Sequence, residues 1–154
     1  MEATKLLSIK KEFTVAASQK TAFDVFTKKM DLWWPRSHHI GSADMTEMVV
    51  ETHVGGRWYS KHADGSEANC GYVLICQPYD LFVLAWQINA DFKCAPDLVT
   101  EVAIEFIPES TSTTRIRFEH KDLHKLGNGK VVESMDGGWG MILQLYKNTA
   151  EHEA

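Results

Sequence analysis

The feature that most constrains the fold of this chain is an apolar stripe near its end. Between residues 136 and 150, apolar side chains recur at intervals of three and four: Trp139, Leu143, Tyr146 and Ala150. This spacing predicts an amphipathic helix that buries one face against a large partner. Residues 11–120 consist mostly of short strand-like segments separated by turns, so we expect the partner to be a β-sheet.

The strand-like segments predict an antiparallel sheet, because they follow one another too closely for the crossovers that parallel strands need. Glu101 and Glu105 alternate with apolar side chains in one segment, and Arg115 and Arg117 do so in the next. These charges are therefore expected to pair across two neighbouring strands. We expect strands at residues 9–15, 46–54, 57–63, 69–77, 81–89, 101–106 and 114–120.

Two helical segments are expected after the first strand. Ser18 is a suitable N-cap, and apolar side chains recur at helical spacing through residues 19–30. Residues 31–41 are dense in aromatics and contain Pro35, so we interpret them as a short helix or turn followed by a loop. Residues 121–135 are interpreted as a long polar segment before the C-terminal helix.

Length and charge narrow the class of protein. A chain of 154 residues is typical of one domain, which we expect to span residues 1–154 with a core at about 11–150. A net charge of -5 without basic clusters argues against a nucleic-acid partner. No apolar run is long enough to span a membrane, and residues 1–5 lack the apolar core of a signal peptide. We therefore expect a cytoplasmic protein.

Motifs for metals, cofactors and nucleophiles are not found in the sequence. Cys70, Cys76 and Cys94 form no C-x-x-C, and we interpret them as buried free thiols. His120 and His124 have a zinc-compatible spacing but lack the H-E-x-x-H pattern. Neither a phosphate-binding glycine loop nor a G-x-S-x-G elbow occurs. The sequence thus predicts no metal and no cofactor.

Several short motifs and their order resemble a known superfamily. They are Gly-Gly-Arg-Trp-Tyr at 55–59, Gly-Tyr-Val-Leu at 71–74, Leu-Xaa-Trp at 84–86, Arg-Phe-Glu-His at 117–120 and Gly-Gly-Trp at 137–139. With the element order, they resemble the START-like (SRPBCC, helix-grip) superfamily, in particular the subgroup related to the C-terminal domain of the activator of Hsp90 ATPase. The resemblance implies an α+β helix-grip fold, in which a curved antiparallel sheet of about six to seven strands wraps around the long C-terminal helix. It also implies a hydrophobic cavity between sheet and helix.

Strand parity and helix face select the residues expected to line that cavity. Their large aromatic rings suit a flat apolar ligand, although the same rings could simply fill the core. The candidates are Phe26, Trp33, Trp34, Trp58, Tyr72, Leu74, Trp86, Val102, Ile104, Phe106, Phe118, His120, Trp139, Leu143 and Tyr146.

His120 is the one candidate with acid-base chemistry, because its parity places it with Ile116 and Phe118 on the inner face. A neutral imidazole there suits a general base or a ligand contact, and it equally suits a structural core histidine. His38 and His39 are positioned to line the cavity entrance, although paired loop histidines usually face solvent.

Three hypotheses of function remain open at this stage. The first is a binder of a small hydrophobic or aromatic ligand, and the second is an interaction protein that acts on an Hsp90-type chaperone. The third is a cofactor-free cyclase that uses His120 with Tyr72 or a nearby carboxylate. Homodimer formation is compatible with each of them and is left undecided by the sequence.

Overall fold

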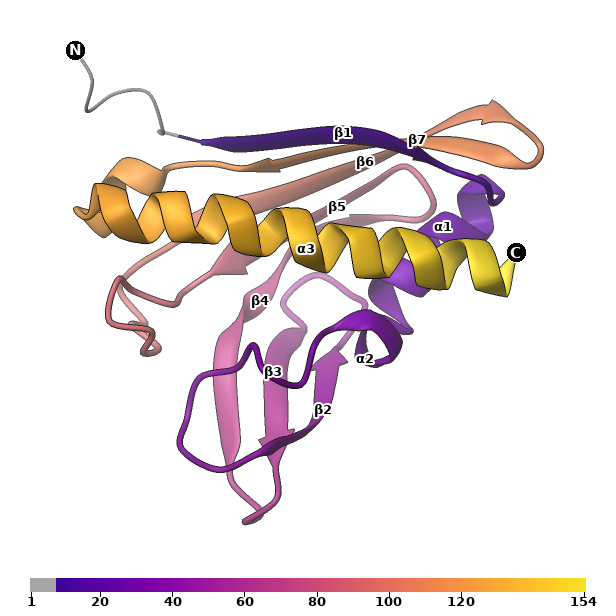
Figure 1. The fold of residues 1–154 in the computed structure, drawn as a ribbon. Coiled ribbons are helices and arrows are strands. Elements are labelled where there is room, and N and C mark those ends of the chain that lie inside the picture. Colours follow the sequence, from indigo (N-terminus) through magenta and orange to yellow (C-terminus); the bar gives the residue numbers. More distant parts are fainter. Residues whose placement is uncertain (1–7) are drawn as a thin grey trace.

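The protein folds as a seven-stranded antiparallel sheet that curves around one long helix, in the α+β helix-grip arrangement expected (Figure 1). The structure, a computed structural model, describes residues 8–154. The strand order is β1-β7-β6-β5-β4-β3-β2. The elements are β1 (Ile9–Val15), α1 (Gln19–Thr27), α2 (Met30–Trp33), β2 (Met45–Val50), β3 (Arg57–His62), β4 (Glu67–Gln77), β5 (Leu81–Trp86), β6 (Thr100–Ser110), β7 (Thr113–His120), η2 (Leu123–Leu126) and α3 (Gly129–Glu153).

Helix α3 lies against the inner face of the sheet through the predicted stripe. Trp139, Leu143, Tyr146 and Ala150 are all buried. The hydroxyl of Tyr146 donates a hydrogen bond of 2.7 Å to the backbone oxygen of Ala22, which connects α3 to α1. Burial raises the pKa of Tyr146, so the phenol remains a neutral donor.

Helix α3 begins at Gly129, seven residues before the start predicted, so the assignment of residues 121–135 to a long polar segment was wrong for residues 129–135. The Asn128 side chain caps the helix by accepting hydrogen bonds from the backbone N–H groups of Lys130 and Val131. Val132 and Met135 extend the buried stripe toward the N-terminus of the helix. The apolar face was therefore longer than the aromatic residues alone indicated.

The two short helices after β1 are confirmed. Ser18 caps α1 by accepting from the backbone N–H of Thr21. The helix stops at Thr27, and α2 resumes at Met30 as a single turn. The indole N–H of Trp33 donates to the backbone oxygen of Val25 at 2.8 Å, which holds α2 against α1.

The inner face of β4 differs from the prediction, which assigned Tyr72 and Leu74 to it. Val73 pairs with Leu84 of β5, and both side chains are buried in the core. Tyr72 pairs instead with Ala85, and Leu74 lies at a register shift between Val73 and Ile75. Because β4 is apolar on both parities, alternation alone could not identify its inner face.

The outer face carries one of the predicted Glu–Arg pairs. Glu105 and Arg117 are register partners on β6 and β7, with a shortest N–O distance of 3.9 Å. Arg115 forms closer ion pairs with Glu12 at 2.8 Å and Glu109 at 2.6 Å. Such exposed pairs contribute at most about 1 kcal/mol each, so the main stability of the sheet comes from its apolar inner face.

No helix among residues 8–154 is long and apolar enough to cross a membrane. The start of the chain, on which the expectation about a signal peptide rests, lies outside the described residues.

Candidate ligand pocket

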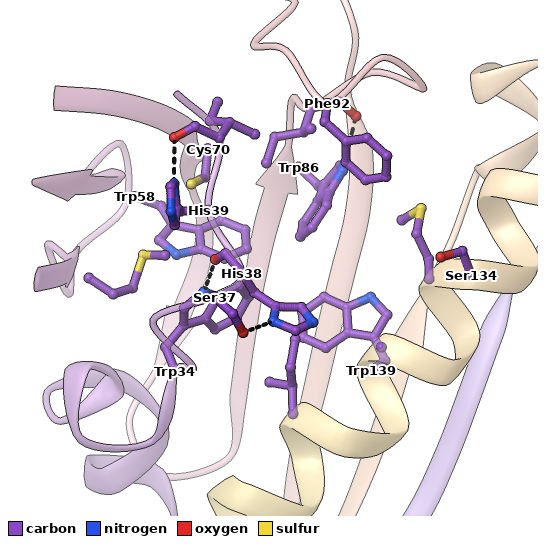
Figure 2. Close-up of a pocket in the computed structure, with 16 residues that line it drawn as sticks. Trp34, Ser37, His38, His39, Trp58, Cys70, Trp86, Phe92, Ser134 and Trp139 are labelled. Atoms are coloured by element: carbon purple, nitrogen blue, oxygen red, sulfur yellow. Dashed lines mark hydrogen bonds between the residues drawn. The ribbon is translucent and has the colours of Figure 1, made fainter. Parts of the chain in front are cut away.

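A pocket of about 300 Å³ opens between α3, the α2–β2 loop and the curved end of the sheet (Figure 2). Its lining comes from β2, β3, β4 and β5 on one side and from α3 on the other, with the β5–β6 loop at the mouth. The lining residues are Trp34, Ser37, His38, His39, Ile40, Met48, Trp58, Cys70, Trp86, Ile88, Phe92, Ser134, Met135, Gly138, Trp139 and Ile142.

Four of these residues form a closed ring of indoles, which we call the tryptophan ring: Trp34, Trp58, Trp86 and Trp139. Each indole contacts two others, with ring centroids 5.9 Å apart for Trp34–Trp58, 5.6 Å for Trp58–Trp86, 5.7 Å for Trp86–Trp139 and 5.8 Å for Trp34–Trp139. The interplanar angles range from 56° to 88°. These are the edge-to-face and tilted arrangements that aromatic pairs favour.

The ring members come from four elements far apart in sequence, and hydrogen bonds fix three of them. The indole N–H of Trp34 donates to the backbone oxygen of His38 at 2.6 Å, and that of Trp86 donates to the oxygen of Ile88 at 3.0 Å. Trp139 donates to Nδ1 of His120 at 3.1 Å. The buried N–H of Trp58 has no acceptor among the described residues. An unpaired buried donor costs about 1–3 kcal/mol. The indole N–H of Trp58 is thus a polar group without a hydrogen-bond partner among the described residues at this side of the pocket.

His120 is sealed behind the tryptophan ring and is not part of the pocket lining. Its exposed fraction is 0%, and burial lowers its pKa from 6.5 to about 3. Because Nδ1 accepts from Trp139, Nε2 carries the proton and donates to the hydroxyl of Thr100 at 2.8 Å. The imidazole is therefore neutral and fully hydrogen-bonded, a geometry that favours the structural interpretation of His120 over the catalytic one.

The structure separates the predicted cavity residues into three groups. Four line the pocket, namely the tryptophan ring. The others on the inner face are buried in the core without lining it: Phe26, Trp33, Val102, Ile104, Phe106, Phe118, His120, Leu143 and Tyr146. Tyr72 and Leu74 are half-buried and belong to neither group. Tyr72 is thus not positioned to act with His120.

Much of the polar lining comes from the α2–β2 loop, of which the sequence indicated His38 and His39 but not Ser37. Ser37 is exposed, whereas His38 and His39 are half-buried and line the pocket. The expectation that these histidines could lie at the entrance is therefore met, although solvent exposure had been favoured. The proline and aromatics at the start of the loop indicated that it packs on the core, but not which side chains it turns inward.

The lining carries no fixed charge, because it contains no Asp, Glu, Lys or Arg side chain. Cys70 is the third titratable lining residue besides the two histidines. Burial raises the pKa of its thiol to about 12, so it stays protonated at neutral pH. The pocket thus combines aromatic walls with a few neutral polar groups.

Metal-ligand clusters of three or more His, Cys, Asp or Glu residues do not occur within residues 8–154. His120 is buried under Trp139, whereas His124 lies exposed on η2. The zinc-compatible spacing of these two residues therefore does not bring them together as a site.

Taken together, the fold and the pocket define a START-like helix-grip protein with an aromatic pocket beneath its C-terminal helix. The family described as activator of Hsp90 ATPase homolog 1-like protein matches residues 16–151. The chain belongs to this family, which confirms the resemblance inferred from its motifs.

Solved structures similar to the chain include proteins with different roles. Txn09, an anthrahydroquino-γ-pyrone synthase in complex with a compound abbreviated SUM, is 30% identical, with a TM-score of 0.68 over 93% of this chain and 96% of that one. CalC, a self-sacrificing resistance protein from Micromonospora echinospora, is 27% identical, with a TM-score of 0.71 over 96% of each chain. An Aha1 dimer from Colwellia psychrerythraea is 16% identical, with a TM-score of 0.67 over 95% of this chain and 97% of that one, and it shares the fold alone. A comparison with curated protein sequences gives no significant match.

Proposed function

We propose that this chain binds a small, neutral, planar aromatic molecule in the pocket. The observation that carries the proposal is the tryptophan ring, which presents aromatic surface from four elements around one space. Aromatic contacts contribute about 0.5–1.5 kcal/mol beyond the burial of area. A flat aromatic ligand gains this additional contact energy from several of the indoles, whereas an aliphatic chain gains only from the burial of its surface.

The size and charge of the pocket support the same ligand class. A volume of about 300 Å³ is at the lower end for small-molecule sites, and it suits a few fused rings better than a lipid. Since no Asp, Glu, Lys or Arg lines the pocket, an ionised ligand would lose hydration without gaining a fixed counter-charge.

The name of one relative above 25% identity is consistent with such a ligand. The name of Txn09 describes the synthesis of an anthrahydroquinone joined to a pyrone, which is a flat polycyclic class of compound. We place the ligand of this chain in that broad class, without assigning the reaction of Txn09 to it.

The test is titration with anthraquinone and 1,4-naphthoquinone, followed through the quenching of tryptophan fluorescence. Two neighbouring glycines of α3 supply matched variants. Gly138 lines the pocket and Gly137 is exposed, and a Cβ atom at either position meets nothing within 4 Å. We expect saturable quenching in the wild type. Gly138→Leu fills the pocket and should weaken binding by at least about tenfold, or ~1.4 kcal/mol, whereas Gly137→Leu should bind as the wild type does.

Choline serves as a control ligand, because rings of aromatic side chains also bind quaternary ammonium cations. Saturable binding of choline without binding of either quinone would refute the proposal, as would equal quinone affinity in the Gly137 and Gly138 variants.

A second candidate function is stimulation of an Hsp90-type ATPase, and the match to the Hsp90-activator family is the observation that favours it. The measurement is the ATPase rate of a purified Hsp90-type chaperone with increasing amounts of this protein. A concentration-dependent rise in rate would support this candidate, and a constant rate up to a large excess would remove it.

A further inference from the structure

The pocket holds two histidines with room for acid-base chemistry, in contrast to the sealed His120. Histidine is the side chain whose ordinary titration falls nearest to neutral pH. Cys70, the remaining titratable lining residue, stays a thiol. His38 and His39 are therefore the groups through which the pocket can exchange a proton with a bound molecule.

His38 is held in place from three directions. Its backbone oxygen accepts from the indole N–H of Trp34 at 2.6 Å, and its backbone N–H donates to the oxygen of Pro35 at 3.0 Å. Its Nδ1 lies 2.9 Å from the hydroxyl oxygen of Ser37. Figure 2 shows the imidazole of His38 between Ser37 and Trp139. Trp34, which forms one wall of the pocket, thus holds the backbone of His38, and Ser37 contacts its ring.

The contact with Ser37 allows His38 to change protonation state without losing its support. A hydroxyl donates to Nδ1 when that nitrogen is unprotonated and accepts from it when it carries a proton. Nε2 makes no hydrogen bond to any residue within 8–154 and is free to take or give a proton. This arrangement differs from that of His120, whose two nitrogens are both engaged.

The pocket lining around His38 contains no Asp, Glu, Lys or Arg side chain that would compete with a ligand for its proton. From α3 the pocket receives Ser134, Met135, Gly138, Trp139 and Ile142, and from the strands Met48, Trp58, Cys70 and Trp86. On its own loop, the nearby Arg36 is paired with Asp31 at 2.9 Å. His39 is the other titratable neighbour, and its Nδ1 lies 3.2 Å from the backbone oxygen of Ile40.

His39 is directed toward a different set of groups. Its ring packs edge-on against His62, with centroids 5.2 Å apart. His62 is buried, with Nδ1 at 2.8 Å from the oxygen of Ala43 and Nε2 at 2.8 Å from the hydroxyl of Ser60. A positive charge on His39 would lie beside this second imidazole.

We propose that His38 exchanges a proton with a phenolic or enolic hydroxyl of the aromatic ligand, and that Ser37 is its positioning residue. The inference rests on the proposed function and names the ligand class more closely. In the forward step the ligand O–H bond breaks and an N–H bond forms at Nε2, while the electron pair stays on the ligand oxygen. The resulting phenolate and imidazolium form an ion pair, and the reverse transfer restores both partners.

The test uses alizarin, a hydroxyanthraquinone whose visible band moves to longer wavelength when its phenolic proton is lost. The pH at which the bound dye ionises is measured for the wild type, His38→Gln, His39→Gln and Ser37→Ala. His53→Gln is the control, since His53 is exposed in the β2–β3 turn and does not line the pocket. A nearby imidazolium favours the phenolate, and an apolar pocket disfavours it.

We therefore expect the wild type to promote ionisation of the bound dye relative to His38→Gln. In His38→Gln the dye should ionise at a pH higher by about one unit, the equivalent of 1.36 kcal/mol. Ser37→Ala should shift ionisation in the same direction by a smaller amount, and His53→Gln should match the wild type.

Two other results would overturn the inference in distinguishable ways. Equal ionisation of bound dye in the wild type and His38→Gln, or a shift confined to His39→Gln, would refute the role of His38 and leave the proposed ligand binding intact. If neither alizarin nor the unsubstituted quinones bind, both proposals fail together.

Discussion

The indole N–H of Trp139 on α3 donates to Nδ1 of His120 at the end of β7, over 3.1 Å. Nε2 of His120 in turn donates to the hydroxyl of Thr100, and that hydroxyl lies 3.3 Å from the backbone oxygen of Trp86. A buried chain of hydrogen bonds thus joins the C-terminal helix to β7, β6 and β5. The same connection orients two members of the tryptophan ring, so the fold and the pocket depend on one polar network.

Two substitutions at Trp139 separate packing from hydrogen bonding. Trp139→Ala should lower the free energy of unfolding by about 3–5 kcal/mol, the usual range for deleting a core aromatic. Trp139→Phe keeps much of the ring but leaves Nδ1 of His120 without its donor, which should cost about 1–3 kcal/mol. Urea denaturation measures both values. A Phe variant as stable as the wild type would show that the hydrogen bond contributes nothing net.

The free energy of unfolding should decrease as the pH is lowered, because His120 becomes protonated. Because its pKa is lowered from 6.5 to about 3 on folding, the unfolded chain binds the proton more readily than the folded one. The contribution is fully present above pH 6.5 and is lost as the pH falls toward 3, with a slope of up to about 1.4 kcal/mol per pH unit.

His120→Gln should flatten this dependence, because glutamine can accept from Trp139 and donate to Thr100 but does not titrate. His124→Gln, at an exposed histidine on η2, is the matched control. The comparison requires the free energy of unfolding at several pH values between 4 and 7. If the free energy of unfolding of the wild type and of His120→Gln changed in parallel with pH, His120 would not be the group responsible for the pH dependence.

Those parts of the fold that depend on a clear periodicity could be predicted from sequence. The stripe on α3 and the alternation in β6 and β7 each repeat often enough to define a face. β4 could not be resolved, because it is apolar on both parities and shifts register after Val73. The start of α3 was missed because its first turns carry few large side chains, and the cap at Asn128 is a single residue.

Apart from the entrance role expected for His38 and His39, the pocket could be predicted only in its aromatic walls. The four tryptophans are large residues on faces that the pattern marks as inner, and they are the predicted residues that line the pocket. Ser37, His38 and His39 belong to a loop, whose path depends on contacts such as that of Trp34 with His38. Periodicity describes helices and strands, and therefore could not tell an accessible loop histidine from the sealed His120.

Replacing Phe92 with glycine should weaken ligand binding without lowering the free energy of unfolding. It lines the pocket mouth with 53% of its surface exposed, and its φ of +59° lies in the left-handed region. That conformation costs a side chain roughly 1–2 kcal/mol, and glycine adopts it freely. Phe92→Gly should therefore keep or raise the free energy of unfolding, by up to about 1 kcal/mol, while weakening quinone binding severalfold.

Met141→Ala is the control for Phe92, since Met141 is also exposed but lies outside the pocket. Thermal unfolding and quinone titration on the same preparations make the comparison. If Phe92→Gly lowered stability and left affinity unchanged, Phe92 would be a structural residue of the β5–β6 loop and not a ligand contact.

Gly71 permits the close approach of β4 and β5 at the floor of the pocket. It is the register partner of Trp86, and a Cβ atom at this position would overlap the backbone oxygen of Ala85. Since backbone cannot move as a flexible side chain does, Gly71→Ala should separate the strands and displace Trp86 from the tryptophan ring. We expect a loss of about 1–3 kcal/mol of stability, as for overpacking in a core, together with loss of quinone binding.

Gly137→Ala adds the same methyl group in open space on α3 and should instead stabilise by about 0.5–1 kcal/mol. Equal stability of the two variants would mean that β4 and β5 can separate at no cost.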